Sequence, residues 1–177
     1  TVNELIVALD EAIITSEEKQ YIISDYILPE VNFVGRKEEL NRIKTIFDSG
    51  LKTVIIHAIG GMGKSELAKK YLQINEKNYD AIVFLRYGDS LHSLVDNISI
   101  GNSSFENKEE HSTVLKTILD SHKVLIIVDN FDVPVDSDDF LTEFLKFNAN
   151  IIFTTRTDFS KCLVENAEQI DVKELFN

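Results

Sequence analysis

The sequence predicts a doubly wound α/β fold, in which helices cover both faces of a parallel sheet of five strands. Short runs that are apolar throughout, such as KVLIIVD at residues 123–129, alternate along the chain with stretches of helical periodicity. A glycine-rich loop, GGMGKS, stands between one apolar run and one helical stretch. Strands that are buried on both faces and joined through helices form a parallel sheet with right-handed crossovers.

Composition limits the size of the fold and the classes of partner. The chain has 177 residues, of which 44% are hydrophobic, which is enough for one domain with a single core. Its formal net charge of -12 would repel a phosphate backbone from most of the surface, so nucleic acid is not expected as a partner. The lone Cys162 cannot form an internal disulfide, and no apolar run approaches the ~18 residues of a membrane span. We therefore expect a cytoplasmic protein that does not enter a membrane.

Residues 1–30 are expected to form a helical segment ahead of the sheet. An apolar stripe with a four-residue repeat runs along residues 5–13. The capping box TSEE starts a second helix, which includes YII at residues 21–23 and ends before Pro29. This segment would be a linker or the tail of an upstream domain, and residues 31–177 would be the main domain.

The elements of the main domain follow in alternation. The first helix carries Leu40, Ile43 and Phe47 on one face and ends at Gly50. Strands are expected at residues 53–59, 81–87, 123–129, 151–156 and 169–173. Further helices are expected at residues 64–74, 91–98, 112–120, 137–147 and 158–167.

The loop AIGGMGKS, residues 58–65, has the pattern of a phosphate-binding loop except for Ala58 at its first position. Glycine tolerates the left-handed backbone and the close approach of phosphate oxygens, and the following helix adds its dipole. Lys64 would reach the β- and γ-phosphates, and the Ser65 hydroxyl would bind Mg²⁺. A glycine turn beside a surface lysine is the alternative, which the full GGMGKS match makes minor. The expected nucleotide contacts in the loop are Gly60, Gly61, Met62, Gly63, Lys64, Ser65 and Glu66.

An acid closes the most apolar strand. KVLIIVDNFD places Asp129 where a magnesium ligand is needed, at the tip of a strand near the loop. Many ATPases of this type have a second acid at the next position, which orients or deprotonates water. Here the residue is Asn130, an amide that can position water but cannot take a proton. Asp132 lies nearby but would need an unusual turn to substitute, so we expect slow hydrolysis.

Arg156 closes the stretch IIFTTR, a strand that would lie beside the strand that leads into the loop. From there its guanidinium would contact the γ-phosphate. A surface arginine at a strand end is the alternative reading, which Lys64 and Asp129 in the correct order disfavour. The catalytic candidates are Lys64, Asp129, Asn130 and Arg156, and the metal ligands are Ser65 and Asp129.

Four stretches in this order resemble the STAND class of P-loop NTPases, specifically the NB-ARC and related bacterial signalling ATPases. They are FVGRKEEL, AIGGMGKSELA, LIIVDNFD and IIFTTR, and they cover about residues 32–156. The resemblance implies the sheet order 5-1-4-3-2, with strands numbered along the chain. It also implies that Arg156 senses the γ-phosphate, and it alone favours adenine over guanine. The residues that would line the base and ribose of ATP or ADP are Phe33, Val34, Gly35 and Arg36.

Members of this class continue into a small helical lid domain and a winged helix, and sensor or effector domains flank the core. We therefore expect residues 31–177 to be a nucleotide-binding core, truncated before the lid, whose partners are its own lid and sensor domains. The implied function is a switch in which ATP or ADP, with slow Mg²⁺-dependent ATP hydrolysis, controls conformational change and self-assembly. Two alternatives stay open: an AAA+-like mechanochemical ATPase acting with DNA, and a nucleotide-dead scaffold that binds a protein partner.

Overall fold

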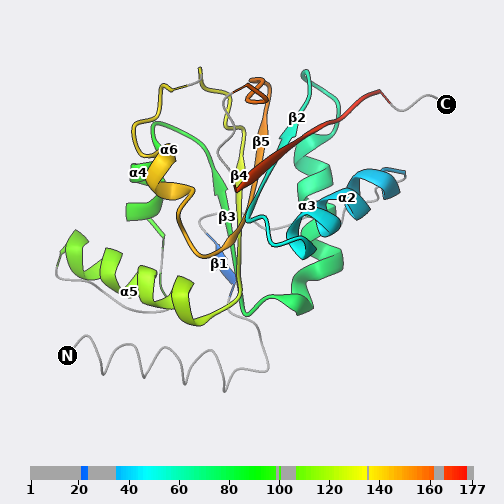
Figure 1. Ribbon diagram of the computed structural model, residues 1–177. Helices are drawn as coiled ribbons and strands as arrows, with labels where there is room; N and C mark the ends of the chain where they lie inside the picture. Colours follow the sequence, from blue (N-terminus) through cyan, green and yellow to red (C-terminus); the bar gives the residue numbers. More distant parts are fainter. Residues whose placement is uncertain are drawn as a thin grey trace.

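The computed structural model describes residues 21–23, 35–98, 100, 107–134, 136–161 and 166–174. These residues form a parallel sheet between two layers of helices, with α2 and α3 on one face and α4, α5 and α6 on the other (Figure 1). The strands are β1 (Tyr21–Ile23), β2 (Thr53–His57), β3 (Ala81–Arg86), β4 (Val124–Asp129), β5 (Asn150–Thr155) and β6 (Ala167–Asp171). The helices are α2 (Lys37–Asp48), α3 (Lys64–Asn75), α4 (Leu91–Asp96), α5 (Lys108–Ser121) and α6 (Leu141–Phe144), with a 3-10 turn η1 (Glu76–Asn78).

The sheet order is β1-β3-β4-β5-β2-β6, and every adjacent pair is parallel. Without β1 this is the predicted order 5-1-4-3-2, so the doubly wound prediction is confirmed, and the architecture is that of a P-loop NTPase-like fold. The loop after β2 and the ends of β4 and β5 consequently meet at one edge of the sheet. Ligands of open parallel sheets bind at this carboxyl edge.

Strand β1 is an addition to the predicted sheet. The second N-terminal helix is wrong at residues 21–23, which pair with β3 in the register Tyr21↔Ile82, Ile22↔Val83 and Ile23↔Phe84. An aromatic residue followed by two β-branched residues suits a strand beside a buried neighbour better than a helix. The apolar stripe at residues 5–13 and the capping box lie outside the described residues.

Three of the predicted helices also differ from the structure. Helix α5 begins at Lys108 because the Asn107 side chain caps it, accepting a 2.9 Å hydrogen bond from Glu110 N. Helix α6 is shorter than residues 137–147, since the Asp138 side chain accepts the Phe140 amide just ahead of it and the Leu91 amide at the start of α4. The helix expected at residues 158–167 is wrong in its described part, where Phe159 N donates to the Gln169 side chain.

Two apolar layers hold the helices to the sheet. On one face, Leu125 and Ile127 of β4 pack with the buried side of α2 and α3. On the other face, Ile126 and Val128 pack with α4, α5 and Phe144 of α6. Strand β4 is thus buried on both sides, which is why its sequence is apolar throughout. Within the described ranges, no helix has both the length and the apolar character needed to span a bilayer.

Candidate functional site

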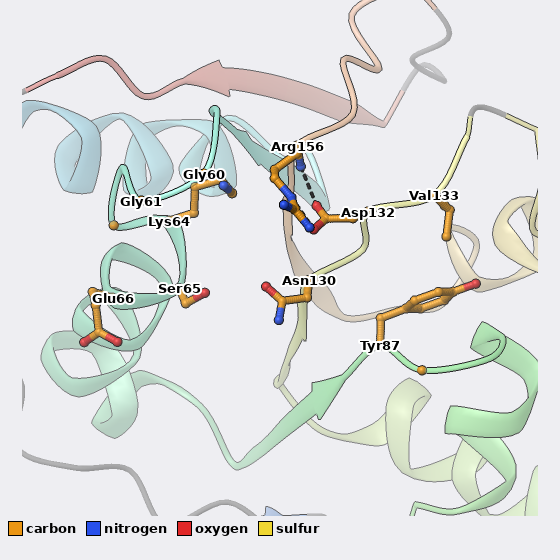
Figure 2. Close-up of a pocket in the computed structure, with 12 residues that line it drawn as sticks. Gly60, Gly61, Lys64, Ser65, Glu66, Tyr87, Asn130, Asp132, Val133 and Arg156 are labelled. Atoms are coloured by element: carbon orange, nitrogen blue, oxygen red, sulfur yellow. Dashed lines mark hydrogen bonds and ion pairs between the residues drawn. The ribbon is translucent and has the colours of Figure 1, made fainter.

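A cleft of ≈ 820 Å³ opens at the carboxyl edge of the sheet. Figure 2 shows the phosphate loop on one side of it, Tyr87 and Val133 on the other, and Asn130, Asp132 and Arg156 between them. Its volume is within the range of small-molecule sites. The cleft is lined by Gly60, Gly61, Gly63, Lys64, Ser65, Glu66, Tyr87, Gly88, Asn130, Asp132, Val133 and Arg156.

Most of the site residues predicted from the sequence lie in this cleft, but not all. Asp129 lies behind the lining, 8% exposed, at the end of β4. Met62 packs partly buried against the α2 and α3 layer. Phe33 and Val34 lie outside the described residues, so their contacts with the base stay a prediction.

The phosphate loop is open to a ligand on its cleft side. Gly61 and Gly63 adopt φ of 80° and 79°, the left-handed region that favours glycine. Gly60 needs glycine for neither conformation nor packing, because a Cβ added there would meet no described atom within 4 Å. Close approach of a ligand to the backbone accounts for a glycine at such a position. The first turn of α3 lines the cleft and no described side chain caps it, so its first amides and its dipole are available to an anion there.

Lys64 is the buried cation of the site. It is 9% exposed, and its Nζ donates hydrogen bonds to the carbonyls of Ala58 (2.9 Å) and Ile59 (3.2 Å). Burial lowers its pKa, opposed by the Asp132 carboxylate, assisted by the Arg156 guanidinium and opposed again by Asp129. An anion in the cleft would stabilise the charged ammonium that burial disfavours.

Arg36 supports the loop from behind. It caps α2 in the left-handed region, with φ of 61°, next to the exposed Gly35. Its guanidinium is buried and donates to Glu39 Oε1 (2.9 Å) and to the Met62 carbonyl (3.2 Å). Arg36 thereby joins the start of α2 to the phosphate loop, while a contact between Arg36 and the base or ribose stays a prediction.

Asp129 is held by the neighbouring strand. The Thr154 hydroxyl of β5 donates to Oδ1 of Asp129 at 2.6 Å, and no described residue engages Oδ2. The same hydroxyl accepts a hydrogen bond from Asn130 N at 3.0 Å. A carboxylate with one oxygen fixed and the other open is suited to binding a hard cation.

The chain after Asp129 makes the turn that Asp132 needs to reach the cleft. Asn130 adopts φ of 60°, a conformation that asparagine tolerates better than most residues, and Asp132 N donates to the Asn130 carbonyl at 2.8 Å. The Asn130 side chain points across the cleft toward Ser65 (Figure 2). Asp132 then accepts hydrogen bonds from Arg156 N (2.6 Å) and Nε (2.7 Å).

The sequence analysis did not predict the far wall of the cleft, which lies opposite the phosphate loop and includes Tyr87, Gly88 and Val133. The Tyr87 ring packs edge-to-face on Phe131, with centroids 4.9 Å apart, and its hydroxyl donates to Asp138 Oδ2 at 2.9 Å. Burial, followed by this hydrogen bond, raises the pKa of Tyr87 to about 12. Tyr87 is the last residue of the predicted strand 81–87 and Gly88 follows it, so the rule that ligands bind at the carboxyl ends of parallel strands was the available signal.

Comparison with known proteins supports the fold. No protein-family model and no curated protein matches the sequence. The crystal structure of Cdc6p from Pyrobaculum aerophilum is similar, with a TM-score of 0.51 and 12% sequence identity. The match covers 90% of this chain but only 48% of the Cdc6p chain. With the strand order, the similarity supports a P-loop NTPase-like fold.

Proposed function

We propose that this chain is the ATP- and ADP-binding switch module of a STAND-type signalling NTPase, with slow Mg²⁺-dependent hydrolysis. The observation that carries the proposal is the distribution of acids in the cleft. Asn130 occupies the position that follows the metal-ligand candidate, and the next acid, Asp132, has both oxygens engaged by Arg156. With an amide at position 130 and with Asp132 engaged by Arg156, neither of the two residues nearest to the metal-ligand candidate is suited to deprotonating water, so we expect a bound nucleotide to be hydrolysed slowly.

The residues present fit a magnesium nucleotide. The amides at the start of α3 and the Lys64 ammonium would hold the phosphates, and Ser65 and Asp129 would hold the ion. When bound, Mg²⁺ supplies neutralisation of the phosphate charge. Arg156 would contribute a positive charge to the γ-phosphate that ADP lacks, which gives the site a means of distinguishing the two nucleotides.

A switch needs a difference in binding free energy, not tight binding as such. Moving a two-state equilibrium from 1:99 to 99:1 takes about 5.5 kcal/mol of differential affinity. We propose that the γ-phosphate supplies this difference through Lys64, Arg156 and the ion. The responding partners would be the lid and sensor domains of the full protein and further copies of the chain, in the cytoplasm.

The test is to measure binding and turnover on the same protein. Calorimetry of ADP and of a non-hydrolysable ATP analogue, with and without Mg²⁺, should give Mg²⁺-dependent binding that Lys64→Met abolishes. Lys44→Met, on the exposed side of α2, is the matched control. ATP turnover should lie far below ~10 s⁻¹, an ordinary enzyme rate, and a rate of that size would overturn the switch proposal. Failure to bind either nucleotide would favour the nucleotide-dead scaffold.

An AAA+-like ATPase acting with DNA is the second candidate. The similarity in fold to Cdc6p keeps it in consideration, since a sheet of this order with a phosphate loop serves both classes. The net charge of -12 and Asn130 disfavour it. ATP turnover stimulated severalfold by duplex or single-stranded DNA would support this candidate over the switch, whereas DNA-independent turnover supports the switch.

A further inference from the structure

Asp132 binds the backbone N and the Nε of Arg156 but not its terminal nitrogens. Its carboxylate accepts one hydrogen bond from the Arg156 backbone N (2.6 Å) and one from Nε (2.7 Å). No described residue engages the two terminal Nη nitrogens. The Arg156 side chain is 62% exposed and that of Asp132 22%, so the better-buried partner holds the more exposed one.

The position of Asp132 is itself set by buried groups. Phe131 is 2% exposed and packs against the rings of Phe153 and Phe159, with ring centroids 4.9 Å and 5.7 Å apart. Its amide donates to the Thr154 carbonyl at 2.8 Å, and its carbonyl accepts from the Thr155 hydroxyl at 2.6 Å. Asp132 therefore projects from an anchored turn, not from a free loop.

We propose that Asp132 is a positioning residue for Arg156. By binding the backbone N and Nε, it fixes the direction of the guanidinium and keeps the Arg156 side chain in the cleft between the phosphate loop and Asp132, where Figure 2 shows it. A γ-phosphate then meets a guanidinium that is already oriented and need not be ordered on binding. This inference rests on the proposed function, because it assigns Asp132 a share in the preference for ATP over ADP.

Two other roles explain the contact between Asp132 and Arg156 less well. A general base is disfavoured because each Asp132 oxygen already accepts a hydrogen bond from Arg156, which leaves only the remaining lone pairs for a water. A stabilising surface ion pair is a weak explanation, because exposed pairs contribute little to folding. A role in orienting a ligand-binding group accounts for both the bidentate contact and the location at the cleft.

A double-mutant cycle tests the proposal. The ratio of ATP-analogue to ADP affinity is measured by calorimetry for the wild-type chain, Asp132→Ala, Arg156→Ala and the double variant. We expect Asp132→Ala to lower the ratio roughly two- to tenfold when Arg156 is present, the cost of ordering a free arginine, and to leave it unchanged in the Arg156→Ala background. An equal effect of Asp132→Ala in both backgrounds, or a higher ratio when Arg156 is present, would overturn the positioning role.

Further variants separate this inference from its premise. Asp139→Asn, which removes an exposed acid from the same loop, should leave the ratio unchanged. Asp132→Asn keeps an acceptor for the Arg156 amide and should fall between wild type and Asp132→Ala, which also guards against misfolding of the alanine variant. If Arg156→Ala lowers the ratio and Asp132→Ala does not, only the inference fails. If Arg156→Ala itself leaves the ratio unchanged, γ-phosphate sensing by Arg156 fails and the inference fails with it.

Discussion

The Thr154 hydroxyl binds the Asp129 carboxylate at 2.6 Å and at the same time accepts the amide of Asn130 at 3.0 Å. One side chain at the end of β5 thus fixes both the metal-ligand candidate and the first residue of the turn behind it. The next residues continue the arrangement, since Thr155 binds the Phe131 carbonyl and Arg156 binds Asp132. The TTR and DNFD stretches are therefore linked residue by residue, since each residue of the first is hydrogen-bonded to a group of the second.

Replacing Thr154 with valine should weaken Mg²⁺-dependent nucleotide binding. The change keeps the shape of the side chain but leaves a buried carboxylate oxygen and the Asn130 amide without a partner, at a cost of about 1–3 kcal/mol in the free energy of unfolding. A Mg²⁺ titration at fixed ADP should show a higher midpoint, and urea unfolding should show lower stability. Thr113→Val, on the exposed face of α5, should change neither. An unchanged Mg²⁺ midpoint would show that Thr154 does not orient the metal ligand.

Replacing Asn130 with aspartate should speed ATP hydrolysis. The position tolerates the change because φ is 60° and aspartate, like asparagine, adopts this conformation. A well-placed general base contributes roughly 10²–10⁴-fold, so a gain near the lower end of that range, about 100-fold, is expected in single-turnover hydrolysis. Asn148→Asp, at an exposed site away from the cleft, is the matched control. Unchanged hydrolysis with intact binding would mean that another feature limits the rate.

The sheet could be predicted from the sequence because its signals are strong and local. Strands such as β4 are buried on both faces, and the strand order was implied by the family resemblance that the flanking motifs carry. Strand β1 could not be foreseen, since YII is three residues long and its partner β3 lies far along the chain. The helix at residues 158–167 failed for a similar reason, because the Gln169 side chain, from β6, takes the Phe159 amide.

The sequence predicted the part of the candidate site that lies within a single motif. It did not predict the contact between residues of two different motifs. The glycines, the lysine and the serine of the predicted loop line the cleft, because one local pattern sets the conformation of the loop, whereas Met62 packs against the layer of α2 and α3. The role of Asp132 depends on the left-handed conformation of Asn130 and on the alignment of β4 with β5. Neither is encoded in a local pattern, so the ion pair between Asp132 and Arg156 emerged only from the structure.

Removing the Lys64 ammonium should change how stability depends on pH. The folded-state pKa of Lys64 is lowered by burial, so the folded chain binds fewer protons than the unfolded chain between that pKa and the ordinary value of 10.5. Wild-type stability should therefore rise, relative to Lys64→Met, as pH increases through this window. The measurement is the difference in unfolding free energy between the two proteins from neutral pH to pH 10.5. A difference that does not vary with pH would contradict the lowered pKa.

Neutralising Asp138 should lower the pKa of Tyr87. The raised value of about 12 owes most to burial and next to the hydrogen bond and charge of Asp138, so Asp138→Asn should move it part of the way toward 10.0. Because the folded pKa exceeds the unfolded one, the neutral hydroxyl stabilises the fold below pH 10 and this contribution is lost as pH rises to about 12. Phenolate absorbance, taken as the difference from Tyr87→Phe, isolates this group from the other tyrosines.

The control for that titration is Asp139→Asn, which removes a neighbouring charge without touching the Tyr87 hydroxyl. It should leave the Tyr87 curve close to wild type, whereas Asp138→Asn should shift it to lower pH. Asp138 also accepts the Leu91 amide at 2.8 Å, so it joins the loop after β4 to the start of α4 and holds the far wall of the cleft. Equal shifts in the two variants would mean that general acidity of the loop, and not the hydrogen bond, sets the Tyr87 pKa. The wall would then lack the specific contact that the structure assigns to it.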